Sequence, residues 1–199
     1  MAPTTEGSAG AITTFARWIS IVAHPFVMVA LMVGGAALRL GSPADAARTM
    51  ALVAVATVLP VAILMLLQVR RGAWSNVDAS NREERPMLFG VGAAGLVALV
   101  GYILVAHPGS FLLRGALGTL GMLAACAVAT RWIKVSLHLA FATLAATTLL
   151  LLGSRLGWVL VPVVPLLGWS RLRLGRHRAT EVVVGGVAGV VTAFAIYVI

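Results

Sequence analysis

The chain has 199 residues, of which 60% are apolar and only 11% are charged, and its mean hydropathy is +1.01. Soluble domains carry roughly a quarter charged residues, so this composition excludes an ordinary soluble domain and predicts an integral membrane protein. The net charge of +9 does not indicate a nucleic-acid partner in a chain with so few polar residues. Membrane lipids and phosphorylated substrates are the expected partners.

Apolar segments follow one another along the chain, and most approach the ~20 residues needed to cross the hydrocarbon core. They cover about 18–38, 48–69, 87–106, 111–130, 135–153, 156–169 and 182–199. The sixth is short and contains Pro162 and Pro165, which leaves open whether it spans the membrane fully. We predict a disordered tail at 1–11 and a single domain at 12–199. Its fold class is an all-α integral membrane protein, a bundle of six to seven transmembrane helices.

If all these segments span, the polar loops divide between two faces of the membrane. The loops at about 70–86, 131–134 and 170–181 fall on one face together with the N-terminus. Nearly every unusual polar residue lies in these three loops. The sequence therefore predicts one functional site, built on this face from three separated segments.

The first segment ends in Arg85-Pro86, directly before an apolar helix. Proline fits the first helical turn, where its missing N–H costs nothing. Arg85 would then lie at a helix N-terminus, where free backbone N–H groups attract anions. In the alternative interpretation, which is favoured for the outer charges, Arg82 and Arg85 pair in a solvated cluster with the carboxylates of Asp78, Glu83 and Glu84.

The second segment, 131–138, opens another helix and places His138 near its start. A histidine inside a membrane segment is costly without a partner, which makes His138 a functional candidate. A structural hydrogen bond is the alternative role.

The third segment holds Arg171, His177 and Glu181 between two apolar runs. His177 and Glu181 are four residues apart, so on a helix they share one face and can touch. A carboxylate on one imidazole nitrogen leaves the other nitrogen free to attack or to accept a proton. Arg171 is the planar donor that suits phosphate oxygens. The alternative is a basic membrane-flanking loop that happens to contain one histidine.

Together the three segments resemble the signature motifs of the type 2 phosphatidic acid phosphatase superfamily. These are membrane lipid phosphatases that share a fold with vanadium haloperoxidases. The family's third motif is Ser-Arg, five residues, His, three residues, Asp. Here it reads Ser170-Arg171, five residues, His177, three residues, Glu181. Glutamate in place of aspartate keeps the carboxylate and adds one methylene.

The other two motifs are matched in part, in the family's order over about residues 70–190. Pro-Ser-Gly-His is reduced here to Ser136-Leu137-His138. The first motif, Lys, six residues, Arg-Pro, keeps Arg85-Pro86 but has Asp78 at the lysine position. A phosphate-binding cation has thus become an anion, and either Arg82 or Lys134 is expected to supply the missing charge.

The resemblance implies a mechanism for the site. His177 attacks phosphorus and forms a phosphohistidine, Glu181 holds its ring, and His138 protonates the departing oxygen and later activates water. The substrate-binding residues would neutralise the phosphoryl oxygens, where phosphoryl transfer is mainly catalysed; they are Arg85, Arg171, Ser136, Lys134 and Arg82. The resemblance implies no metal and no other cofactor. The expected substrate is a lipid phosphate or a polyprenyl diphosphate.

Positive charge predicts the orientation in the membrane. Only four of the 15 Lys and Arg residues fall on the face without motifs, namely Arg39, Arg48, Arg114 and Arg155. Loops this short lie within the range where Lys and Arg set topology. We therefore expect a multi-pass protein of the plasma membrane with its site on the cytoplasmic side.

Two other classes of function stay open. One is a catalytically inactive relative on the same fold, a lipid-binding or scaffold protein, which the loss of the motif lysine supports. The other is a small membrane transporter, supported only by the helical bundle.

Gly185 and Gly189 permit close helix contact, either within the bundle or across a homodimer. His24-Pro25 and His107-Pro108 are interpreted as structural.

Overall fold

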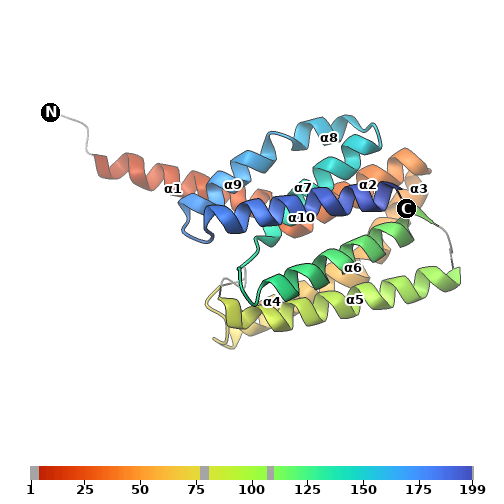
Figure 1. The fold of residues 1–199 in the computed structure, drawn as a ribbon, viewed down its shortest axis with the longest axis horizontal. Coiled ribbons are helices and arrows are strands. Elements are labelled where there is room, and N and C mark those ends of the chain that lie inside the picture. Colours follow the sequence, from red (N-terminus) through yellow and green to blue (C-terminus); the bar gives the residue numbers. More distant parts are fainter. Residues whose placement is uncertain (1–4, 77–80, 107–109, 199) are drawn as a thin grey trace.

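The computed structural model describes residues 5–76, 81–106 and 110–198, and within these ranges the chain is helical, without a strand. Figure 1 shows the helices lying roughly along one direction. The helices are α1 (Thr5–Val22), α2 (Pro25–Leu40), α3 (Pro43–Val53), α4 (Leu59–Arg70), α5 (Arg85–Ala106), α6 (Phe111–Ala129), α7 (Leu137–Leu151), α8 (Arg155–Leu160), α9 (Val163–Arg173) and α10 (Ala179–Val198).

The apolar helices fit an all-α membrane protein. Among the described residues, four helical stretches are long and apolar enough to cross a membrane: Pro43–Arg70, Arg82–Ala106, Phe111–Ala129 and Ala179–Val198. A fifth is added if α1 and α2, which bend by 43° at their junction, count as one span. Helix α7 is apolar but has only 15 residues. The expected count of six to seven spans is therefore not confirmed.

The sixth apolar segment is broken where the sequence places a proline. Helix α8 ends at Leu160 and α9 begins at Val163. Pro162 lies between them and lacks the backbone N–H that would continue the helical hydrogen bonds. Helix α9 continues to Arg173, so Ser170 and Arg171 lie in its last turns and not in the loop where they were expected. The helix stops just before Gly175, which adopts the left-handed conformation that glycine tolerates best.

The N-terminal tail also differs from expectation. Helix α1 begins at Thr5, so part of the stretch expected to be disordered is helical. Residues 1–4 lie outside the described residues.

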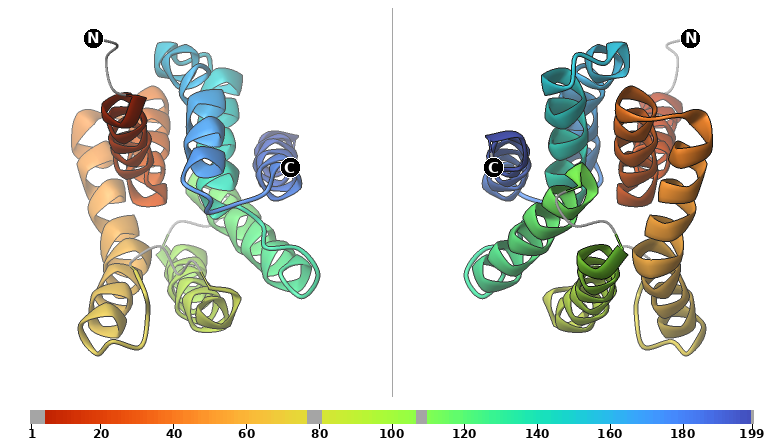
Figure 2. Two further views of the ribbon diagram at one scale, coloured as in Figure 1. Left: turned by 90° about the vertical axis from the view of Figure 1, so that its left-hand side faces the viewer. Right: turned by 90° about the vertical axis from the view of Figure 1, so that its right-hand side faces the viewer.

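Helix α7 occupies the centre of the bundle (Figures 1 and 2). It packs against α2, α8, α9 and α10, and buries most of its length. A helix that is apolar on all sides lies either in a protein core or in lipid, and α7 lies in the core. The outer helices instead present large apolar side chains such as Val55 and Val105 at the surface, as expected of chains that face lipid.

Two glycines allow α10 to lie directly on the first half of α7. A Cβ atom at Gly185 would fall on the carbonyl oxygen of Ser136, and one at Gly189 would fall on that of Ala140. The Thr143 hydroxyl lies in the same contact, 2.9 Å from the Gly186 carbonyl oxygen and 2.8 Å from that of Leu139 on its own helix. The small-residue spacing in α10 thus serves contact within the bundle.

Substitution of Gly189 should therefore destabilise the protein. In Gly189→Leu the two helices must separate, and overpacking of this kind typically costs ~1–3 kcal/mol. Gly101→Leu on α5 is the matched control, because Gly101 is exposed and a Cβ there meets no atom within 4 Å. Thermal unfolding in detergent, followed by circular dichroism, should show a lower Tm for Gly189→Leu only. Equal melting temperatures would mean that the close approach is not needed.

Candidate active site

The three motif segments meet at one end of the bundle, on the left in Figure 1. Arg82 donates from its two terminal nitrogens to the carbonyl oxygens of Arg131 and Trp132, each at 3.3 Å. Arg85 donates to the Val135 carbonyl at 2.7 Å. These three bonds attach the start of α5 to the loop between α6 and α7. Among the described residues neither arginine forms an ion pair with Glu83 or Glu84, so the solvated cluster is not found for these two carboxylates, and Asp78 lies outside the described residues.

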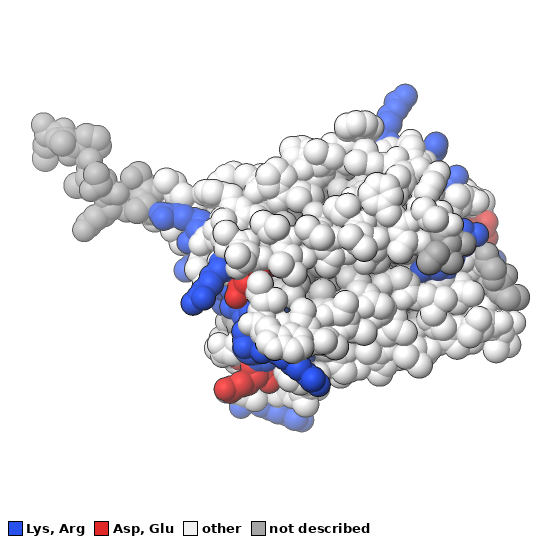
Figure 3. All heavy atoms as spheres, viewed as in Figure 1, with Lys and Arg blue, Asp and Glu red and all other residues white. Residues whose placement is uncertain are grey.

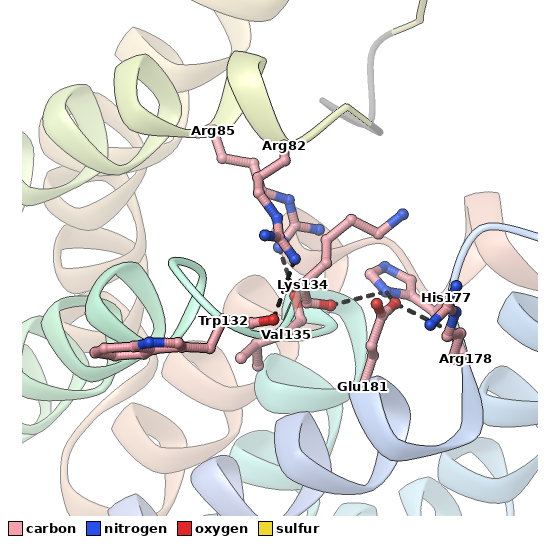
Figure 4. Close-up of polar contacts among 8 residues, drawn as sticks. All are labelled: Arg82, Arg85, Trp132, Lys134, Val135, His177, Arg178 and Glu181. Carbon is pink, nitrogen blue, oxygen red and sulfur yellow. Dashed lines mark hydrogen bonds and ion pairs between the residues drawn. The ribbon is translucent and has the colours of Figure 1, made fainter.

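The second segment is joined to the third through the backbone and through His177. The Ser136 N–H donates to the Glu181 carbonyl at 3.1 Å. His177 Nδ1 lies 2.9 Å from Glu181 Oε2 and 3.1 Å from the Lys134 carbonyl oxygen, as Figure 4 shows. The expected contact between His177 and Glu181 is therefore present, with a second acceptor that spacing alone did not indicate.

These two neighbours determine which ring nitrogen of His177 carries the proton. A carboxylate and a carbonyl oxygen both accept, so Nδ1 is the N–H donor and Nε2 keeps its lone pair. The Arg178 N–H donates to the same Glu181 oxygen at 3.1 Å and fixes the carboxylate. His177 is thus oriented, like the histidine of a catalytic triad, with Nε2 available as a nucleophile or base.

The surroundings of His177 keep its ring neutral. Burial lowers the pKa of the imidazole, and the positive charge of Arg171 lowers it further. The hydrogen bond with Glu181 raises this pKa but does not offset the other effects, to which Arg85 and Lys134 also contribute. A neutral imidazole at pH 7 is the form that a nucleophile requires.

Buried polar atoms without partners gather at the start of α7. Ser136 is fully buried at the N-cap position, yet its hydroxyl makes no capping bond. Within the described part of the chain, Ser136 Oγ, His138 Nε2 and Arg85 Nε have no hydrogen-bond partner. Buried polar groups are normally satisfied. The first backbone N–H groups of a helix also lack partners within it, and together with these atoms they suit an anion.

Two buried arginines add positive charge to this place. Arg171 is 2% exposed and donates to the Ser20 hydroxyl at 2.7 Å, which ties α9 to α1. Arg85 is 4% exposed, and no carboxylate among the described residues lies within ion-pair distance of it. A buried cation without a counter-ion is costly. Buried positive charge of this kind favours anions.

The two candidates for the missing motif charge differ in position. Figure 4 draws the Lys134 side chain on the His177 side of the loop, whereas the Arg82 guanidinium is occupied by backbone carbonyls. Partial burial lowers the pKa of Lys134, and the charge of Glu181 opposes that effect. Asp78, at the motif lysine position, lies outside the described residues.

One residue beside the site was assigned only a structural role from the sequence. The His24 ring lies edge-on against His138, with centroids 5.3 Å apart at 85°. Its Nδ1 accepts the Phe26 N–H at 3.3 Å, so Nε2 carries the proton. The sequence around His24 shows only a His-Pro pair at a helix start. It could not predict the contact with His138, because the packing of α2 against α7 joins residues far apart in the chain. His107 lies outside the described residues.

No group of three or more His, Cys, Asp or Glu side chains in the described ranges is placed to hold a metal ion.

Compared with known proteins, the chain matches no protein-family model, no curated protein and no solved structure. Function is therefore inferred from the geometry of the site.

The low pKa of His177 can be measured directly. We expect its ring to stay neutral as the pH falls below the ordinary histidine value of ~6.5, because a lowered pKa moves protonation to more acidic solution. Glu181→Gln removes an interaction that raises the pKa, so it should shift the titration further toward acid. Nitrogen-15 NMR of histidine-labelled protein in detergent measures the pKa of His177 in the wild-type protein and its shift in Glu181→Gln. Titration of His177 at or above 6.5 would contradict the assignment.

Proposed function

We propose that the protein is a membrane phosphatase that hydrolyses a lipid phosphate or a polyprenyl diphosphate through a phosphohistidine at His177. The observation that carries the proposal is the hydrogen bond from His177 Nδ1 to Glu181, beside buried Arg85 and Arg171. This hydrogen bond leaves His177 as a neutral nucleophile next to two buried arginines, whose positive charge favours anions. The order and spacing of the three motifs, which resemble those of the lipid phosphatase superfamily, support the same conclusion.

In the first half of the reaction, His177 Nε2 attacks phosphorus as the bond between phosphorus and the departing oxygen breaks. His138 donates a proton to that oxygen, and Glu181 stabilises the positive charge that forms on the His177 ring. In the second half, His138 accepts a proton from water, and the resulting hydroxide attacks the phosphohistidine. Inorganic phosphate leaves, and His177 recovers its lone pair.

The remaining residues hold the phosphoryl oxygens. Arg85, Arg171 and the Ser136 hydroxyl lie where charge on the non-bridging oxygens would be neutralised, which is the main source of catalysis in phosphoryl transfer. Lys134 takes the role of the motif lysine. Arg82 holds the α6–α7 loop in position through its two carbonyl contacts.

We also propose six to seven membrane crossings, a location in the plasma membrane, and a site that opens to the cytoplasm. Lys and Arg side chains gather at the end of the bundle that carries the site, as Figure 3 shows, with fewer at the opposite end. Basic loops of this length tend to remain on the cytoplasmic side. Substrates made on the inner leaflet would reach such a site directly.

The decisive experiment measures phosphate release from a panel of lipid phosphates by purified protein in detergent with EDTA. His177→Ala should abolish turnover and any acid-labile phosphoenzyme. Glu181→Gln should lower kcat by about 10²–10⁴-fold, as loss of an orienting carboxylate does in a triad. Glu83→Gln is the matched control, because the Glu83 side chain is exposed and has no role in the proposed mechanism.

Full activity in His177→Ala would remove the mechanism. Binding of lipid phosphates without turnover by the wild-type protein would instead favour the inactive lipid-binding relative, which Asp78 in place of lysine supports. Activity lost with EDTA and restored by Mg²⁺ would count against metal-independent chemistry.

A separate prediction concerns the charge that replaces the motif lysine. Lys134→Gln should lower kcat/KM by an amount equivalent to about 2–4 kcal/mol, the usual effect of losing one charged contact to the transition state. Arg82→Gln should have a smaller effect, since its guanidinium holds a loop. Wild-type kinetics in Lys134→Gln, with a large loss in Arg82→Gln, would reverse the two roles.

A further inference from the structure

Helix α1 contributes no residue to the three motifs, yet it packs along α9, the helix that carries Arg171 (Figure 1). Two hydrogen bonds cross this contact. The Ser170 hydroxyl donates to the Ala16 carbonyl oxygen at 2.6 Å, and Arg171 Nη1 donates to the Ser20 hydroxyl oxygen at 2.7 Å. The N-terminal helix is therefore bonded to the last turns of α9, where that helix reaches the site.

Arg171 connects α1 with the loop that carries His177. Its guanidinium bonds to Ser20, whereas its backbone carbonyl oxygen lies 3.1 Å from the N–H of Arg176 and 3.4 Å from that of His177. The positive charge of Arg171 is close enough to His177 to lower the pKa of its ring. A change in the position of the guanidinium should therefore be felt at His177.

The bond to Ser20 restricts the direction of the guanidinium. This group is planar and presents five N–H donors at fixed angles, so holding one terminal nitrogen also orients the others. The contact is buried, with Ser20 7% and Arg171 2% exposed, so water cannot readily take the place of the hydroxyl. A hydroxyl is also neutral, and it leaves the positive charge of Arg171 in place for an anion.

We propose that Ser20 is a positioning residue, which holds the Arg171 guanidinium in the orientation that binds the phosphoryl oxygens beside His177. This inference rests on the proposed function and adds to it a residue that lies outside the three motifs. Ser20 acts through Arg171. Helix α1 thereby becomes a fourth segment of the site, more than 150 positions before His177 in the chain.

Three substitutions separate positioning from packing. Ser20→Ala removes the hydroxyl but keeps the small side chain that the contact between α1 and α9 requires. Ser20→Thr restores a hydroxyl at the same place. Ser170→Ala is the matched control, because it removes the other hydrogen bond between the same two helices and leaves the bond between Ser20 and Arg171 intact.

The first measurement is the binding of inorganic phosphate to purified protein in detergent, by isothermal titration calorimetry. Ser20→Ala should bind phosphate at least tenfold more weakly than the wild-type protein. Ser20→Thr and Ser170→Ala should both stay within threefold of wild type. An unchanged affinity in Ser20→Ala would overturn the proposal. So would an equal loss in Ser170→Ala, because both hydroxyls would then serve only to hold α1 on α9.

The second measurement needs no ligand and follows the titration of His177 by nitrogen-15 NMR. In Ser20→Ala the pKa of His177 should rise, because the charge that lowers it is no longer held in place. In Arg171→Gln that charge is absent, so adding Ser20→Ala should shift the pKa no further. Additive shifts would show that Ser20 acts on His177 independently of Arg171, and would overturn the proposal.

The two measurements also distinguish the failure of this proposal from the failure of the proposed function. A wild-type protein that binds no phosphate, with the expected His177 shift in Ser20→Ala, would refute the phosphatase and retain the link between Ser20 and Arg171. Phosphate binding by the wild-type protein, with no change of affinity or of His177 titration in Ser20→Ala, would refute the role of Ser20 alone.

Discussion

The close contact between α7 and α10 is the constraint on which the rest of the site depends. Gly185 and Gly189 let the α10 backbone reach the carbonyl oxygens of Ser136 and Ala140. In that register the Ser136 N–H bonds to the Glu181 carbonyl. The first turns of the two helices are then side by side, so the carboxylate of Glu181 and the polar start of α7 cannot move apart independently.

From this fixed pair, the other elements are attached by hydrogen bonds to backbone carbonyls. Arg82 and Arg85 bring α5 to the α6–α7 loop, and Lys134 offers its carbonyl to His177. Carbonyl acceptors suit this purpose, because they hold the two arginines without neutralising their charge. Arg82 and Arg85 therefore keep their positive charge, whereas carboxylate partners would have cancelled it.

The polar atoms of this site are costly to the folded protein. Ser136 Oγ, His138 Nε2 and Arg85 Nε lack partners among the described residues, and each buried unsatisfied group typically costs about 1–3 kcal/mol. The packed interior around α7 offsets that cost. An anion could accept hydrogen bonds from several of these atoms at once, so the features that are costly in the protein also favour an anion.

The sequence by itself determined the membrane class, the apolar helices and the contact between His177 and Glu181, since composition, long apolar runs and an i, i+4 spacing are local properties. Tertiary structure alone decided that His24 lies on His138, that Lys134 contributes its carbonyl, and that Arg82 holds a loop. These contacts join residues that are tens to more than a hundred positions apart, and only the packing of the helices brings them together. The break between α8 and α9 at Pro162 is instead a local effect that the sequence already indicated.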